Sequence, residues 1–206
     1  MTGLVQQLQA DALDQSVSVS TLLRKVKVSA VKLGLSDTVE WADQELKGYK
    51  EEVPSYRMVR GRCMGLNPYH GWSVVGGDPK IVEALSQRAL GQAISSLEEL
   101  TTGDKDQLMV TLPPKTVNGI TSSNPGCQDV AIFISQADVL AIVDHVRNLV
   151  LDWALNLEKA GIMGDGLSFT AVEQRRAEAI AMNIKIDGPN ARLNIGSIDH
   201  SHNAAD

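Results

Sequence analysis

Cysteine is scarce in this chain, whose 206 residues contain only Cys63 and Cys127. Neither thiol has ligand-type residues beside it at zinc spacing, so we expect two reduced cysteines rather than a disulfide framework or a metal site. His200 and His202 lie close together near the end, but two ligands without a third make a poor metal centre. No cofactor fingerprint occurs either. We therefore expect neither a metal nor a cofactor.

Long hydrophobic runs are also missing. The most apolar helical segment, 139–157, is interrupted by charged and polar residues. A membrane-spanning helix needs about 20 predominantly apolar residues, which no segment provides. The first residues lack both the charged and the apolar region of a signal peptide. We expect no membrane partner and a cytoplasmic location.

An excess of positive charge is absent as well. The chain has 19 basic and 25 acidic residues, a formal net charge of −6. This balance argues against a protein coated in nucleic acid, although a local basic patch stays open. The hydrophobic fraction of 43% is close to that of globular proteins and excludes wholesale disorder. A chain of this length is expected to form one domain, with or without an appendage.

Helical periodicity dominates what the sequence does contain. Apolar side chains recur at three- and four-residue spacing in several segments, which is the pattern of an amphipathic helix. The longest such segment would form a rod of about 38 Å at the rise per residue of an α-helix, long enough to be the spine of the domain. The predicted helices are 4–13, 18–34, 36–48, 79–100, 135–161 and 170–181.

Capping residues mark the ends of these predicted helices. Three of the starts show a capping-box pattern, in which a side chain that can cap stands three residues before an acidic one. Gly34 suits the left-handed position that ends the second helix, and Asp78 suits the N-cap of the fourth. The three pairs are Asp37 with Glu40, Ser135 with Asp138, and Thr170 with Glu173.

Strand signals are shorter. Segment 56–64 (YRMVRGRCM) favours extended chain, and 72–75 can pair with it as a hairpin. Segments 108–112 and 130–134 are apolar runs of strand length, separated by a loop rich in Pro, Gly, Ser and Asn. The sequence therefore predicts a mainly helical α+β fold: a helical bundle around the long 135–161 helix, with a small antiparallel sheet.

The last 25 residues change character. Two alternating segments flank the turn Asp187-Gly188-Pro189-Asn190 and predict a C-terminal β-hairpin over 183–198, followed by a polar end. We therefore divide the chain into a domain at 1–181 and a hairpin with its tail at 182–206. Because an isolated two-stranded hairpin is marginal in water, it should dock on the body, pair with another subunit or be partly mobile.

His70 is the most interesting ionisable residue. It stands in the string Asn67-Pro-Tyr-His-Gly-Trp72, where a histidine could act as a general base or contact a ligand, and it is our weak catalytic candidate. The alternative is that Tyr69, His70 and Trp72 lock this turn by packing and hydrogen bonding. The alternative is favoured because no nucleophile or carboxylate stands at a recognisable spacing.

Three arginines gather in the segment predicted to be a strand. Arg57, Arg60 and Arg62 could bind phosphate, nucleotide or RNA, with Arg60 and Arg62 on one face. Tyr69 and Trp72 nearby could stack on bases. The alternative is a charged edge that pairs with acidic helix faces and discourages edge-to-edge association. The acidity of the chain favours this alternative, so nucleic acid is not the favoured partner.

Several short strings resemble the AbiTii domain family, which is associated with bacterial abortive-infection systems against phage. The resemblance implies a bacterial or phage context and a role in defence or its regulation, with members regarded as toxic effectors. It brings no established reaction and no catalytic residues. The strings include SVSTLLRK at 18–25, EW at 40–41, ELKGY at 45–49, VPSYR at 53–57, NPYHGW at 67–72, LDWAL at 151–155, LEKAG at 157–161 and SFT at 168–170.

Three hypotheses for function follow. The first, from the resemblance, is an abortive-infection effector or control module that acts through macromolecular contact. The second is an enzyme acting on nucleotides or RNA through His70 and the three arginines, so enzymatic activity is left open. The third is a self-assembling module, in which the Ser135–Gly161 helix or the C-terminal hairpin pairs subunits.

Overall fold

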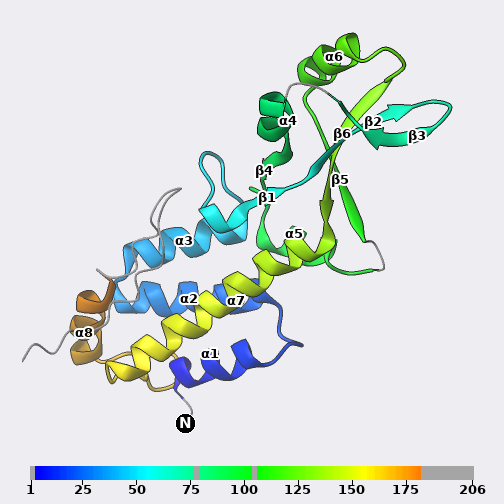
Figure 1. Ribbon diagram of the computed structural model, residues 1–206. Coiled ribbons are helices and arrows are strands. Elements are labelled where there is room, and N and C mark those ends of the chain that lie inside the picture. Colours follow the sequence, from blue (N-terminus) through cyan, green and yellow to red (C-terminus); the bar gives the residue numbers. More distant parts are fainter. Residues whose placement is uncertain (1–2, 77–78, 104–105, 182–206) are drawn as a thin grey trace, which may run out of the picture.

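The computed structural model describes residues 3–76, 79–103 and 106–181. These residues form a helical bundle and, beside it, an arm built on a four-stranded sheet (Figure 1). The fold is mainly helical α+β, as the sequence predicts, and the long helix is its spine. The predicted hairpin and tail at 182–206, with His200 and His202, lie outside the described residues.

The bundle buries one apolar face of each of its main helices. The longest helix, α7, packs against α1, α2 and α5, while α3 and α8 pack against α2 (Figure 1). Leu8, Leu23 and Val146 are among the fully buried side chains at these contacts. The helices of the bundle are α1 (Leu4–Leu13), α2 (Val19–Leu33), α3 (Ser36–Lys47), α5 (Ile94–Leu100), α7 (Gln136–Lys159) and α8 (Ala171–Ala181).

Capping residues mark some of the helix ends. The Ser135 hydroxyl accepts a hydrogen bond from the Ala137 N–H at the start of α7, and Gly34 ends α2 at φ 76°. The capping box predicted at Asp37 and Glu40 is wrong, because α3 starts directly after the turn that ends α2. Leu35 occupies its N-cap position without a side-chain bond.

The helix predicted at 79–100 is wrong in its middle. Helix α4 (Pro79–Ser86) and α5 are separated by strand β4 (Gln87–Ala89), which pairs with β1 (Met58–Arg60) in antiparallel register. This pairing joins positions far apart in the chain, so local periodicity does not show it. Asp78, the predicted N-cap, lies outside the described residues.

The strand predicted at 56–64 is also broken into parts. A 3₁₀ turn (Ser55–Arg57) leads into β1, and Gly61 separates β1 from β2 (Arg62–Asn67). A Cβ at Gly61 would lie 2.4 Å from Ile132 Cγ2 and 2.8 Å from the Phe133 carbonyl oxygen. The chain therefore passes so close to the sheet at this point that only glycine fits.

The arm holds an antiparallel sheet in the order β3-β2-β6-β5. The predicted hairpin is confirmed as β2 with β3 (Gly71–Val74), and the two apolar runs are β5 (Gln107–Thr111) and β6 (Asp129–Ser135). The segment predicted as a loop between β5 and β6 contains helix α6 (Pro114–Ser123). Helices α4 and α6 belong to the arm with the sheet (Figure 1).

Candidate functional site

The two faces of the four-stranded sheet differ in what covers them. Alternate residues of a strand point to opposite faces, so the pairing register assigns every side chain of the sheet. On the covered face, the core takes in Cys63, Val130, Ile132 and Ile134 of β2 and β6, with Leu85 of α4 and Val117 and Ile120 of α6 packed against it. The helices of the arm therefore shield this face.

The opposite side, which we call the open face, is also apolar. Of its apolar residues only Ala131, at the centre of the face, is buried. Val74 is 66% exposed and Met109 is 55% exposed. Contiguous apolar surface of this kind marks a contact site more often than scattered exposed residues do. The apolar residues of the open face are Met64, Leu66, Trp72, Val74, Met109, Ala131 and Phe133.

Two aromatic rings meet on the open face. Trp72 on β3 and Phe133 on β6 lie with ring centroids 5.2 Å apart and ring planes at 62°. Strand β2 lies between these strands, so the rings meet across it. The edge-to-face contact holds both rings against the sheet and gives the open face a firm aromatic ridge.

Opposite charges stand at opposite ends of the open face. Arg62 is paired in register with Phe133, and Asp129 with Leu66, at the other end of the same two strands. Both are exposed, and neither has an ion pair with another described residue. A cavity of about 260 Å³ adjoins the Arg62 end, lined by Arg60, Asp106 and Asp138 among others. The cavity is thus lined by two carboxylates and two guanidinium groups, of which Arg60 is paired with Glu83.

His70 and Tyr69 stand at the tip of the β2–β3 hairpin. The Asn67 side-chain oxygen accepts hydrogen bonds from the backbone N–H of Tyr69 at 2.9 Å and of His70 at 3.2 Å. The Tyr69 side chain is 89% exposed, and His70 is exposed too. Asn67 thus holds the turn, while Tyr69 and His70 do not pack into it. His70 lies at the far end of β2 from Arg62, so these two do not share one site.

Arg57 is not part of any surface. It is fully buried, and its Nε and Nη2 both donate to the carboxylate of Glu45 on α3. Its Nη1 donates to the carbonyl oxygens of Leu90 at 2.9 Å and Gln92 at 2.6 Å. The expectation of three arginines on one binding surface is therefore corrected, because a saturated and inaccessible guanidinium cannot bind an external ligand.

Arg60 and Arg62 are also placed differently from the prediction. They belong to β1 and β2, which lie in different sheets on either side of Gly61, rather than to one face of one strand. Arg60 is paired with Glu83 of α4, as the charged-edge alternative expects. The two arginines come together only in lining the cavity beside Asp106 and Asp138.

Sequence reasoning missed the polar network around Glu45. The hydroxyls of Tyr49 and Tyr56 each donate to Glu45 Oε1 at 2.7 Å, and Trp41 Nε1 donates to the Tyr56 hydroxyl at 3.0 Å. Burial, reinforced by the Glu45 charge, raises the pKa of both tyrosines. They stay neutral donors that satisfy Glu45, so the network fixes α3 to the segment before β1.

His145 on α7 borders this network. Its ring lies 4.7 Å from the Tyr56 ring, measured between centroids. Partial burial lowers the pKa of His145, against the opposing influence of Glu45 and Asp152. No spacing in the sequence connects Glu45, Tyr56 and His145, since they come from three separate elements. Of this arrangement the sequence predicted only the helix over 36–48 that carries Glu45.

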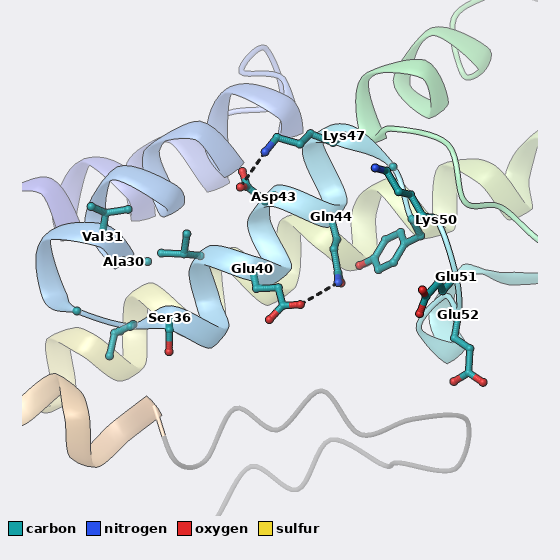
Figure 2. A pocket seen from close by; sticks show the side chains of 15 residues that line it. Ala30, Val31, Ser36, Glu40, Asp43, Gln44, Lys47, Lys50, Glu51 and Glu52 are labelled. Carbon is teal, nitrogen blue, oxygen red and sulfur yellow. Dashed lines mark hydrogen bonds and ion pairs between the residues drawn. The ribbon is translucent and has the colours of Figure 1, made fainter.

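A groove of about 950 Å³ lies along α3 (Figure 2). Val31, Leu35 and Val39 are among its apolar lining residues. Its rim charges are partly neutralised within the chain, because Asp43 accepts hydrogen bonds from Lys27 at 2.5 Å and Lys47 at 2.9 Å. Lys50 and the carboxylates of Glu40, Glu51 and Glu52 also line the groove, so side chains of both signs border it.

Neither a metal site nor a membrane span emerges from the part of the chain that the structure describes. Within residues 3–76, 79–103 and 106–181, no three His, Cys, Asp or Glu side chains are grouped so as to hold a metal ion. None of the described helices is long and apolar enough to cross a bilayer.

Comparison with known proteins gives one match. No curated protein and no solved structure matches the chain. The family model AbiTii matches residues 3–182, which include both the bundle and the arm. A match over most of the chain confirms the resemblance carried by the short strings described above. The chain therefore belongs to the AbiTii family, and this membership indicates a role related to abortive infection.

Proposed function

We propose that the chain acts in abortive infection as a contact module, either an effector or its control component, and that the open face is its contact surface. The observation that carries this proposal is the apolar open face itself. All of its apolar residues except Ala131 are at least partly exposed, although the opposite face of the same sheet is shielded by two helices. A sheet covered on one side only leaves an apolar surface that a partner can bury.

The position of the open face supports this function. Most of the sheet lies in the arm, beyond the helices of the bundle (Figure 1). The aromatic ridge of Trp72 and Phe133 offers large rings of the kind that dominate binding energy at protein interfaces.

An enzyme acting on nucleotides or RNA is supported less well. Its proposed residues are separated, with Arg57 buried, His70 at the hairpin tip and Arg62 at the opposite end of β2. Asp106 and Asp138 beside Arg60 and Arg62 would repel phosphate. Contact with protein therefore fits the surface better than contact with nucleic acid.

The experiment is a phage-challenge and growth assay in a bacterial host that expresses the chain. Met109→Lys and Val74→Lys place charge on exposed positions of the open face, so both should fold normally and lose protection or growth arrest. Leu13→Lys is the matched control, since Leu13 is 71% exposed at the end of α1 in the bundle. It should act like the wild type. Equal protection by all three variants at equal protein levels would contradict the proposal.

A further inference from the structure

We propose that the partner of the open face is a second copy of this chain, bound face to face. This inference rests on the proposed function, because it names the occupant of the same surface. The dimer would be isologous, with the same patch contributed by both subunits, which is the commonest symmetry of soluble oligomers.

The charges of the open face favour a copy over other partners. The face carries one unpaired positive side chain, Arg62, and one unpaired negative side chain, Asp129, around an apolar middle. These two charges cancel on the open face, although the whole chain has a net charge of −6. A polyanion such as RNA would meet the negative charge of Asp129 on the face itself, whereas a surface bearing both signs is complementary to itself.

The register places the two charges symmetrically. Arg62 is opposite Phe133 and Asp129 is opposite Leu66, while Met64 and Ala131 form the pair midway between them. The two ends are four residues apart along β2, a separation of about 13 Å at the rise of a strand. The apolar centre of the face is therefore flanked by opposite charges at equal distances.

This symmetry selects one arrangement of the dimer. Two sheets packed face to face are related by a two-fold axis that lies between them. An axis perpendicular to the strands, passing over the Met64–Ala131 pair, reverses the strand direction and brings Arg62 of each copy over the Asp129 end of the other. An axis parallel to the strands would instead place the Arg62 ends together. Of these two axes, only the perpendicular one forms two ion pairs, and it places Val74 of each copy against Val74 of the other.

Charge reversal gives a sharp test on the purified full-length chain. We expect the wild type to have twice the mass of the 22.2 kDa chain at high protein concentration when measured by light scattering or sedimentation. Arg62→Asp and Asp129→Arg should each weaken self-association by at least about tenfold, since each substitution creates like-charge contacts at both ends of the interface. Arg24→Asp reverses an exposed arginine on α2 and should leave the dimer intact.

Mixing the two variants tests the axis itself. In a mixed dimer the new aspartate of one chain faces the new arginine of the other, and the native Asp129 of the first faces the native Arg62 of the second. The mixture should therefore form a one-to-one heterodimer, visible by native mass spectrometry with chains of different tag mass. The chain that carries both reversals should regain the homodimer.

Several outcomes would overturn the dimer. A wild type that stays monomeric at every concentration would do so, as would a dimer that tolerates both single reversals. A dimer lost on deleting 183–206 but kept in both reversals would assign assembly to the C-terminal segment. Salt-sensitive binding of single-stranded RNA by a monomer, lost in Arg62→Asp, would assign the face to nucleic acid instead.

The failure of the dimer and the failure of the contact function can be told apart. If the chain is monomeric and Met109→Lys still abolishes protection, the contact function survives with a different partner. If the dimer forms but Met109→Lys and Val74→Lys protect normally, the contact function fails and the dimer stands.

Discussion

Glu45 and Arg57 form a fully buried ion pair between α3 and the segment that leads into β1. Both side chains are completely shielded from solvent. The Arg57 guanidinium and the hydroxyls of Tyr49 and Tyr56 donate to the Glu45 carboxylate or to backbone carbonyl oxygens. Removing one partner of such a buried pair strongly destabilises the fold, because the remaining charge stays buried and cannot be solvated.

Arg57→Ala should therefore lower the free energy of unfolding by about 3–5 kcal/mol, since it leaves Glu45 buried without its partner. Arg60→Ala is the control, because it removes only the exposed pair with Glu83 and should change stability by less than about 1 kcal/mol. Urea unfolding followed by circular dichroism measures both. Similar losses of unfolding free energy in the two variants would show that burial does not make the Arg57 pair more important than the exposed Arg60 pair.

The hairpin tip should depend on Asn67 rather than on His70. Asn67→Ala removes the acceptor for two backbone N–H groups, at a cost of about 1 kcal/mol, and should lower the melting temperature measurably. His70→Ala should leave the melting temperature and phage protection unchanged, because the imidazole is exposed and apart from the arginines. Loss of protection by a stable His70→Ala protein would instead support the enzyme hypothesis.

His145 should titrate below the ordinary pKa of 6.5, since partial burial disfavours its charged form. The unfolded chain then binds the proton more tightly, so this contribution to stability is complete above pH 6.5 and declines as the pH falls toward the lower, folded-state pKa. Imidazole NMR shifts report the titration. Asp152→Asn removes a charge that raises the pKa of His145 and should lower it further, whereas a rise would show that the influence of Asp152 has the wrong sign.

Glu173 should contribute to stability only above acidic pH. Slight burial opposes its ionisation, yet hydrogen bonds from the backbone of Thr170, Gly164 and Met163 and from the Thr170 hydroxyl lower the pKa to about 2. Because the folded pKa lies below the ordinary 4.5, the stabilisation is complete above pH 4.5 and is lost as the pH falls toward 2. Denaturation at a series of pH values should show a smaller loss over this window for Glu173→Gln. An unchanged pH profile would exclude this role for the Glu173 carboxylate.

Local chemistry predicts the helical part of the fold well. Ser18, Gly34 and Ser135 act as caps where their residue types predict them, and Thr170 with Glu173 forms the predicted capping box. Each of these features depends on neighbours within four residues, which a single sequence contains. The confirmed β2–β3 hairpin is similarly local.

The rest of the fold depends on contacts between segments far apart in the chain, which the sequence alone does not show. Gln87–Ala89 directly follows helix α4, and its pairing with strand β1 holds it extended. Helix α6, with Gly119 and several Ser and Thr residues, has weak helical propensity and is stabilised by packing on the sheet. Arg57 looked like a surface residue because its partner, Glu45, belongs to another element. The open face could not be recognised before the strand order and register were known.

Ser135 is both the last residue of β6 and the N-cap of α7. The central strand of the sheet therefore continues into the spine of the bundle with no linker to absorb a change of angle. Because α7 packs against α1, α2 and α5, any rotation of the sheet relative to the bundle would have to be absorbed by these helix contacts. The arm and the bundle are thus mechanically coupled through one continuous segment of chain.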